Sequence, residues 1–167
     1  MTGTRLLILV DDSPACKRAV AYVASMVGRQ RGLRFYLAHP LAPVPARLLE
    51  FRGAENPYEE ERLDVQLKER QNRWTSATQE AAQQLFARAQ ATLRKSGVMP
   101  SAVKTEFFAP GSGRKAADSI LKLARANRCN TVVVGRRSVP WLRKLLKKEL
   151  AEELVRRGAG FTIWVVE

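Results

Sequence analysis

The sequence is poor in the residues that cross-link chains or bind metals: 167 residues include two cysteines and one histidine. Cys16 and Cys129 are too few for the disulfide framework of a small secreted protein, so we expect both to be reduced thiols in a cytoplasmic protein. His39 is the only histidine, and two scattered cysteines cannot complete a metal-ligand cluster with it. We therefore expect no metal site.

Long apolar stretches are also missing, because no run approaches the roughly 18 residues that a membrane span needs. The first apolar run, Leu6–Val10, is short and has no small-residue cleavage site after it, so we interpret it as a buried strand rather than a secretion signal. Hydrophobic residues make up 46% of the chain, which is enough for a packed core. We expect a single soluble domain over residues 1–167, with no membrane insertion.

Acidic residues are scarce relative to basic ones, with 16 Asp and Glu against 29 Lys and Arg and a formal net charge of +13. Such a charge attracts polyanions such as nucleic acid. A solvated basic surface explains the same number and is the favoured interpretation, since charge alone locates no site. A nucleic-acid-binding module stays a less favoured alternative, because no aromatic stacking surface or recognition helix is evident.

Patterns of catalysis are missing as well. The sequence contains no Walker A motif, no Ser-His-Asp or Cys-His arrangement and no evident carboxylate pair. The stretch 111–116 has the form GxGxxA, but it follows the third predicted strand and has no acidic ribose partner at the expected distance, which favours a tight loop. Cys16 falls in the first turn of a predicted helix, where a buried small side chain is favoured over a reactive thiol. We expect no enzyme activity.

What the chain does have is a regular alternation of short apolar runs with helical patterns. Continuous hydrophobicity is typical of parallel strands that are covered on both faces. The runs predict a parallel α/β sheet with helices on both faces, a Rossmann-like fold. The five predicted strands are Leu6–Val10, Leu33–His39, Val103–Ala109, Thr131–Gly135 and Phe161–Val166.

The stretch Tyr58–Lys95 predicts one long helix that follows a proline-rich excursion over residues 41–57. Its first half, through Arg73, is mostly charged, and we expect that half to project into solvent or to cover a neighbour. Its second half is amphipathic. The predicted apolar stripe consists of Trp74, Thr78, Ala81, Leu85, Ala89 and Leu93, with Ala82 and Phe86 beside it.

Two predicted strands end in polar residues that suit a ligand. In open parallel sheets, ligands bind beyond the carboxyl ends of the strands. The first strand ends in Asp11, Asp12 and Ser13, and the fourth ends in the stretch 135–138, Gly-Arg-Arg-Ser. If these strands are neighbours, an acidic acceptor faces a glycine turn flanked by arginines, as in a nucleotide crevice. Helix capping explains Asp12 and Ser13 equally well.

Both stretches resemble the universal stress protein family. Residues 6–13 resemble the opening strand of that family, residues 131–138 its fourth strand and residues 142–156 its final helix. The resemblance implies a five-stranded sheet in the order 3-2-1-4-5, which places Asp11 next to Gly135. It also implies a homodimer that is paired through the last strand, where Phe161, Ile163 and Val165 would form the edge.

Family members that bind ATP carry the pattern Gly-x2-Gly-x9-Gly-Ser/Thr, whose backbone amides hold the phosphates. The corresponding positions here are Gly135, Ser138 and the pair Lys148 and Glu149, so one glycine of three is kept. A side chain where φ is positive costs on the order of 1 kcal/mol. The resemblance also assigns to the nucleotide site Asp11, which contacts adenine in the binders, together with Pro40, Val134 and Arg137.

We therefore expect a stress-response protein that acts by binding an unknown protein partner, without a cofactor and without the usual ATP mode. The alternative is a regulator that still binds ATP or AMP, with charged side chains replacing the lost glycine amides. The cations available for that role are Arg136, Arg137, Arg143, Lys144, Lys147 and Lys148.

Overall fold

The computed structural model describes residues 3–27, 30, 32–50, 56–110, 115–136 and 150–167, which form one five-stranded parallel sheet in the order β3-β2-β1-β4-β5. The strand order and the parallel direction confirm the predicted Rossmann-like α/β class. The register places Leu6 between Phe35 and Thr131. The strands are β1 (Arg5–Leu9), β2 (Arg34–Pro40), β3 (Val103–Phe108), β4 (Thr131–Gly135) and β5 (Thr162–Val166).

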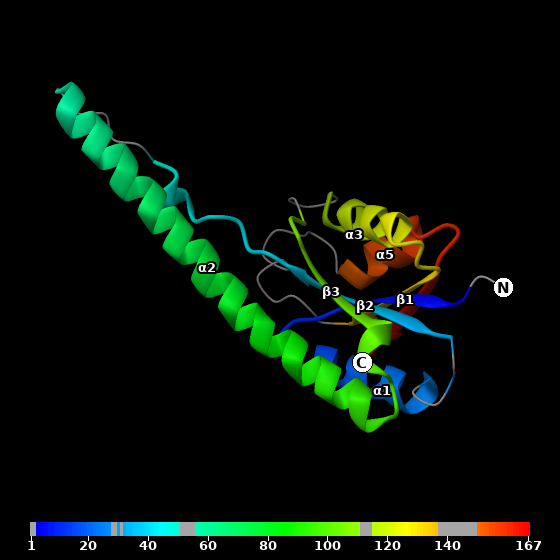
Figure 1. Cartoon of the computed structure of the whole chain (residues 1–167). Coiled ribbons are helices and arrows are strands. Elements are labelled where there is room, and N and C mark those ends of the chain that lie inside the picture. The colour runs from blue at the N-terminus through cyan, green and yellow to red at the C-terminus, as the bar shows by residue number, and fades with distance from the viewer. Residues whose placement is uncertain (1–2, 28–29, 31, 51–55, 111–114, 137–149) are drawn as a thin grey trace.

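Two layers of helices cover the sheet (Figure 1). The helices α1 (Pro14–Val27) and α2 (Pro57–Lys95) pack on one face, and α3 (Lys115–Ala126) and α5 (Leu150–Arg157) pack on the other. Along β1, Leu6 and Ile8 point into the first layer, whereas Leu7 and Leu9 point into the second. Burial on both faces explains why β1 is a continuous apolar run in the sequence.

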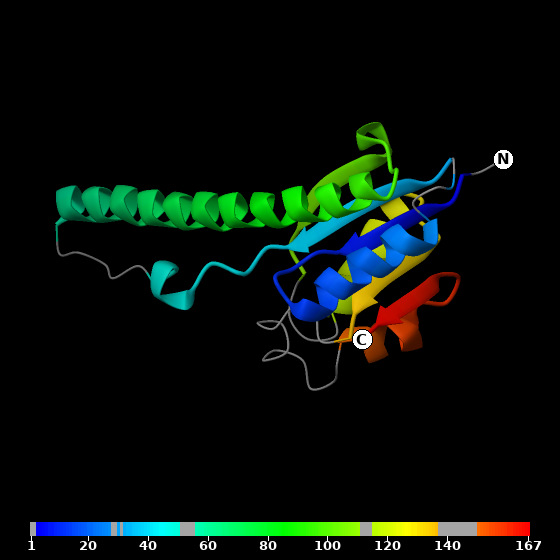
Figure 2. The ribbon, with the colours of Figure 1, turned by 90° about the horizontal axis from the view of Figure 1, so that it is seen from below.

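The helix α2 extends far beyond the sheet, past the carboxyl ends of the strands (Figures 1 and 2). Its N-terminus is capped by Asn56, whose Oδ1 accepts a hydrogen bond from the Tyr58 amide at 3.0 Å. Its buried side chains all lie toward its C-terminal end and are Ala82, Phe86, Ala89 and Leu93. The predicted stripe was therefore wrong in its first half: Trp74 is half-buried and Ala81 is exposed, because no sheet lies beneath them.

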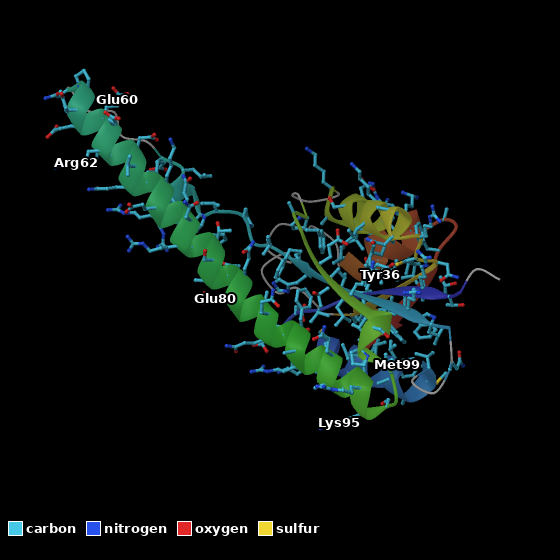
Figure 3. All side chains as sticks on the ribbon, viewed as in Figure 1. Tyr36, Glu60, Arg62, Glu80, Lys95 and Met99 are labelled. Atoms are coloured by element: carbon cyan, nitrogen blue, oxygen red, sulfur yellow. The ribbon has the colours of Figure 1, made fainter. Side chains whose placement is uncertain are left out.

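We call residues 57–81 of α2, together with the segment 41–50 beside them, the arm. The segment contains the short 3-10 helix η1 (Ala46–Leu48), and Gln71 donates a hydrogen bond to the Leu48 carbonyl at 2.6 Å. A pair of Lys68 with Asp64, one turn apart, adds a little local helix stability. Figure 3 shows charged side chains along the arm, among them Glu60, Arg62 and Glu80. The charged half thus projects from the domain, which agrees with the first of the two predicted alternatives.

Candidate functional site

Asp11 lies directly after β1 and is buried, with 6% of its surface exposed. Its Oδ1 accepts a hydrogen bond from the Ser13 amide at 2.8 Å, which closes a local turn of the kind that aspartate favours. Its own amide donates to Cys16 Sγ at 3.2 Å. Asp11 therefore orders the connection between β1 and α1.

Ser13 caps α1, because its Oγ accepts a hydrogen bond from the Cys16 amide at 3.1 Å. Asp12 is exposed and forms ion pairs with Lys17 at 3.4 Å and with Arg88 at 3.8 Å. Arg88 belongs to α2, so the second pair ties α2 to the start of α1. The capping interpretation thus holds for Ser13, whereas Asp12 links two helices.

Gly135, the last residue of β4, packs directly against the first turn of α1. A Cβ atom at this position would lie 2.6 Å from the Ala15 carbonyl carbon and 2.8 Å from the Cys16 amide nitrogen. The absence of a side chain is therefore required for the close approach of strand and helix. Val134 is fully buried beside it and pairs with Val165 of β5.

At the end of β2, Pro40 is buried and pairs with Phe108 of β3. The preceding residue, His39, was not among the predicted site residues. Its Nδ1 lies 2.7 Å from the Val10 carbonyl oxygen, so a protonated Nδ1 donates a hydrogen bond there and joins the ends of β1 and β2. The sequence feature that could have identified His39 is its position, a polar side chain at the end of an apolar strand and one residue before Pro40.

The hollow beside Asp11 is small, with a volume of about 70 Å³. It lies between α1 and α2, and Lys17, Arg88 and Thr92 form part of its polar lining. Sites for small organic ligands are typically about 300–1,000 Å³. The structure thus brings Asp11 and Gly135 together at the first turn of α1. The hollow between α1 and α2 is a separate feature, because Gly135 is not part of its lining, and it has room for no more than a small group.

The predicted phosphate-loop residues Arg137, Ser138, Lys148 and Glu149 lie outside the described residues, as does the glycine-rich stretch 111–114. Arg136 is the first residue of the cationic loop that the structure describes, and its side chain pairs with Glu167. Within the described part of the chain, no three His, Cys, Asp or Glu side chains gather as metal ligands would. None of the described helices has the length and apolar character to cross a membrane.

The thiol of Cys16 is buried beside Asp11, and this burial raises its pKa to about 12. Its Sγ also donates a hydrogen bond to the Leu9 carbonyl at 3.4 Å. A thiol that stays protonated is a poor nucleophile. Cys16 thus behaves as a small core side chain, in line with the favoured interpretation.

The two edges of the sheet differ in character. On β3 the side chains of Lys104, Thr105 and Glu106 are exposed, and charged edge residues discourage pairing with another strand. The β5 edge is more apolar: Val165 is 38% exposed, Ile163 is half-buried against the core, and Phe161 is half-buried just before the strand. An open groove of about 410 Å³ lies beside β5, lined in part by Val155 and Val165.

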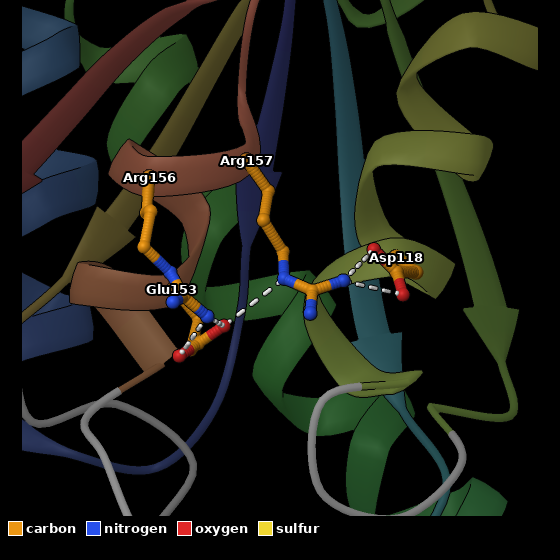
Figure 4. A network of polar contacts seen from close by, with 4 residues as sticks. All are labelled: Asp118, Glu153, Arg156 and Arg157. Atoms are coloured by element: carbon orange, nitrogen blue, oxygen red, sulfur yellow. Dashed lines mark hydrogen bonds and ion pairs between the residues drawn. The ribbon is translucent and has the colours of Figure 1, made fainter.

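The Glu153 carboxylate, which forms part of the lining of this groove, organises α5 (Figure 4). Glu153 accepts hydrogen bonds from Arg156 at 2.7 and 2.8 Å and from Arg157 at 3.0 Å. Arg157 also binds Asp118 of α3 through both carboxylate oxygens. The hydrogen bonds from Arg156 lower the pKa of Glu153. This network is structural, because it fixes α5 to α3.

The sequence model of the universal stress protein family matches residues 3–160. The chain belongs to the universal stress protein family. No curated protein matches it in sequence.

Solved structures of other universal stress proteins share this fold at low sequence identity. The protein UspA from Lactobacillus plantarum is 16% identical with a TM-score of 0.63, and the match covers 100% of this chain and 99% of that one. A universal stress protein from Archaeoglobus fulgidus in complex with dAMP is 17% identical, with a TM-score of 0.57 and full coverage of both chains. A universal stress protein in complex with cAMP is 14% identical, with a TM-score of 0.56 and coverage of 100% and 98%. At these identities the likeness establishes the fold alone.

Proposed function

We propose that this universal stress protein acts in the cytoplasm by binding a protein partner during stress, rather than by turnover, and without the usual ATP mode of the family. The observation that carries the proposal is that Asp11 and Gly135, two of the predicted site residues that the structure describes, each have a structural role at the start of α1. Because the Asp11 carboxylate accepts a hydrogen bond from the Ser13 amide, its presence after β1 has a structural explanation and is weak support for an adenine contact.

The sequence of the phosphate loop supports the same conclusion. Only Gly135 of the three glycines is kept, and Gly135 has a structural reason to be glycine because of its contact with α1. Glu149 brings a negative charge to the position where the family pattern of ATP binders has Ser or Thr. Retention of Gly135 is therefore weak support for nucleotide binding.

Two nucleotide complexes among the structural relatives, with dAMP and with cAMP, support the alternative of an adenine-nucleotide-binding regulator. In that case the cationic loop that begins at Arg136 would hold the phosphates through side chains instead of glycine amides. Arginine suits this role because its guanidinium fork matches phosphate oxygens.

Calorimetric titration of ATP and AMP, at low and at physiological salt, separates the two functions. We expect no binding, or weak binding that salt abolishes, and no ATP hydrolysis above background. The matched variant is Asp11→Asn, which keeps an oxygen acceptor for the Ser13 amide while removing the charge. Salt-resistant binding that Asp11→Asn weakens would overturn the proposal in favour of the nucleotide-dependent regulator.

We also propose that the protein is a homodimer paired through β5, on the support of its apolar edge and the groove beside it. Sedimentation equilibrium should give twice the chain mass of 18.7 kDa. Val165→Lys, a charge on the edge, should return the mass to that of one chain, whereas Thr105→Lys on the β3 edge should not. A wild-type protein that sediments as a single chain at micromolar concentration would contradict the dimer.

A further inference from the structure

The amino-terminal ends of the strands carry a row of cations. These ends lie on the opposite side of the sheet from Asp11, which follows the carboxyl end of β1. Arg5 and Arg34 are the first residues of β1 and β2 and pair directly in the register. Lys104, the second residue of β3, pairs with Tyr36. Because Leu7 and Tyr36 belong to the core under α3 and α5, the side chains of Arg5, Arg34 and Lys104 share that face.

The end of α3 adds two more arginines beside the amino-terminal ends of the strands. Arg5 Nη1 donates a hydrogen bond to the Asn127 carbonyl at 3.2 Å, and the Asn130 amide donates to the Arg5 carbonyl at 3.1 Å. Between these contacts the chain turns at Arg128, whose φ is 52°. Arg125 lies one turn before Arg128 and is exposed. We call these five residues the basic row: Arg5, Arg34, Lys104, Arg125 and Arg128.

Few acidic side chains lie near the basic row. In the described part of this edge, Glu106 is the acidic neighbour, and its Oε2 accepts a hydrogen bond from Asn127 Nδ2 at 3.0 Å. The arm instead carries a large share of the acidic residues of the chain, so positive charge at this edge is not neutralised locally. The arm carboxylates are Glu50, Glu59, Glu60, Glu61, Asp64, Glu69 and Glu80.

The dimensions of the row fit an extended polyanion. Five strands about 4.8 Å apart make an edge about 19 Å wide. A nucleic-acid duplex carries one phosphate per strand for about every 3.4 Å of helix axis, so several backbone phosphates fall within that width. Four of the five cations are arginines, whose planar guanidinium binds phosphate through two hydrogen bonds.

The aromatic neighbours of the row argue against a lipid surface. Binding to a bilayer interface combines cations with apolar side chains that enter the headgroup region. Here the Tyr36 ring is buried with Lys104 Nζ 6.0 Å from its centre, and the Phe161 ring has the Arg125 guanidinium 5.2 Å from its centre. The row therefore presents charge without an apolar wedge.

We infer that the basic row binds the phosphate backbone of nucleic acid without reading its sequence. This inference goes beyond the proposed function and does not depend on it, because the row and the Asp11 hollow lie at opposite edges of the sheet. With five phosphate contacts, binding should fall with a log–log salt slope of about −4.5, which is about 500-fold between 50 and 200 mM salt.

The test is fluorescence anisotropy of a labelled DNA duplex of about two helical turns, and of an RNA strand of the same length, across a salt series. The row variant combines Arg34→Gln with Arg128→Gln, two exposed side chains, and should weaken binding and reduce the slope by about 2. The matched control combines Arg62→Gln with Arg70→Gln on the arm, which removes the same net charge and should leave both quantities unchanged.

Three outcomes would overturn the inference: no binding by the wild type at low salt, equal losses in the row variant and the arm control, or binding to anionic vesicles but not to nucleic acid. Equal losses would mean that net charge alone attracts the probe. Arg34→Lys with Arg128→Lys keeps the charges and should keep the slope, which guards against a folding defect in the glutamine variant.

Discussion

Gly135→Ala tests whether the first glycine of the phosphate loop is kept for packing rather than for nucleotide binding. The added Cβ would lie 2.6 Å from the Ala15 carbonyl carbon and 2.8 Å from the Cys16 amide nitrogen. Both are backbone atoms of the first turn of α1, so no flexible side chain can rotate away. The turn itself must shift, together with the hydrogen bonds that Asp11 makes to it.

The cost follows from that geometry. Overpacking of a well-packed interior typically costs about 1–3 kcal/mol. The neighbour here is backbone held by the Ser13 cap, so we expect a loss of about 2–3 kcal/mol in the free energy of unfolding, near the upper end of that range. For a domain whose total stability is about 5–15 kcal/mol, this is a large fraction.

Urea unfolding followed by circular dichroism measures the effect, with Gly160→Ala as the comparison. Gly160 has a φ of 85° and nothing within 4 Å of an added Cβ, so its cost comes from backbone strain alone, about 1 kcal/mol. Asparagine tolerates that backbone region and should reduce the loss at Gly160, whereas at Gly135 its larger side chain should increase the loss. A Gly135→Ala variant within about 0.5 kcal/mol of the wild type would refute the packing argument.

Three further predictions concern the core, the acid stability and the thiol. Phe86→Ala should lower the free energy of unfolding by about 3–5 kcal/mol in urea, whereas Tyr58→Ala on the arm, where Tyr58 is 85% exposed, should change it by less than about 0.5 kcal/mol. The lowered pKa of Glu153 means that its ion pairs stabilise the fold above pH 4.5 and are lost as the pH falls through the lowered value. Thermal unfolding across that range should therefore show a shallower pH dependence for Glu153→Gln, and equal slopes would exclude this role. Because burial raises the pKa of Cys16 to about 12, a thiol reagent at about pH 8 should modify Cys16 in the Cys129→Ala variant only on unfolding, and rapid labelling of the folded protein would contradict its burial.

The central strands β1, β2 and β4 were predictable because burial on both faces leaves mainly apolar runs in the sequence. The edge strand β3 has a weaker pattern, because its Lys104, Thr105 and Glu106 are exposed. The long helix was predictable for a different reason, since residues from Asn56 to Lys95 combine a cap, a proline at the first position and no glycine. Its buried part was not predictable in detail. Periodicity marks which side of a helix is apolar, but the length of sheet beneath it decides where burial begins, and this is why Trp74 is only half-buried.

The site was predictable in its position and less so in its chemistry. Sequence reasoning placed Asp11 and Gly135 at one edge, because the carboxyl ends of neighbouring parallel strands meet there. It did not show that the Asp11 carboxylate is bonded to the Ser13 amide, since that contact depends on a turn. The role of His39 was also missed, because its hydrogen bond to Val10 joins residues of two strands and leaves no local pattern.

The arm also has a hydrodynamic consequence. A compact domain of this length has a radius of gyration of about 15 Å and a diameter of about 40 Å. At 39 residues, α2 alone is about 58 Å long. A single chain should therefore diffuse more slowly than a sphere of its mass and elute early from a gel-filtration column, where it could be taken for a dimer. The frictional ratio, measured together with the mass, distinguishes an elongated chain from a pair of chains.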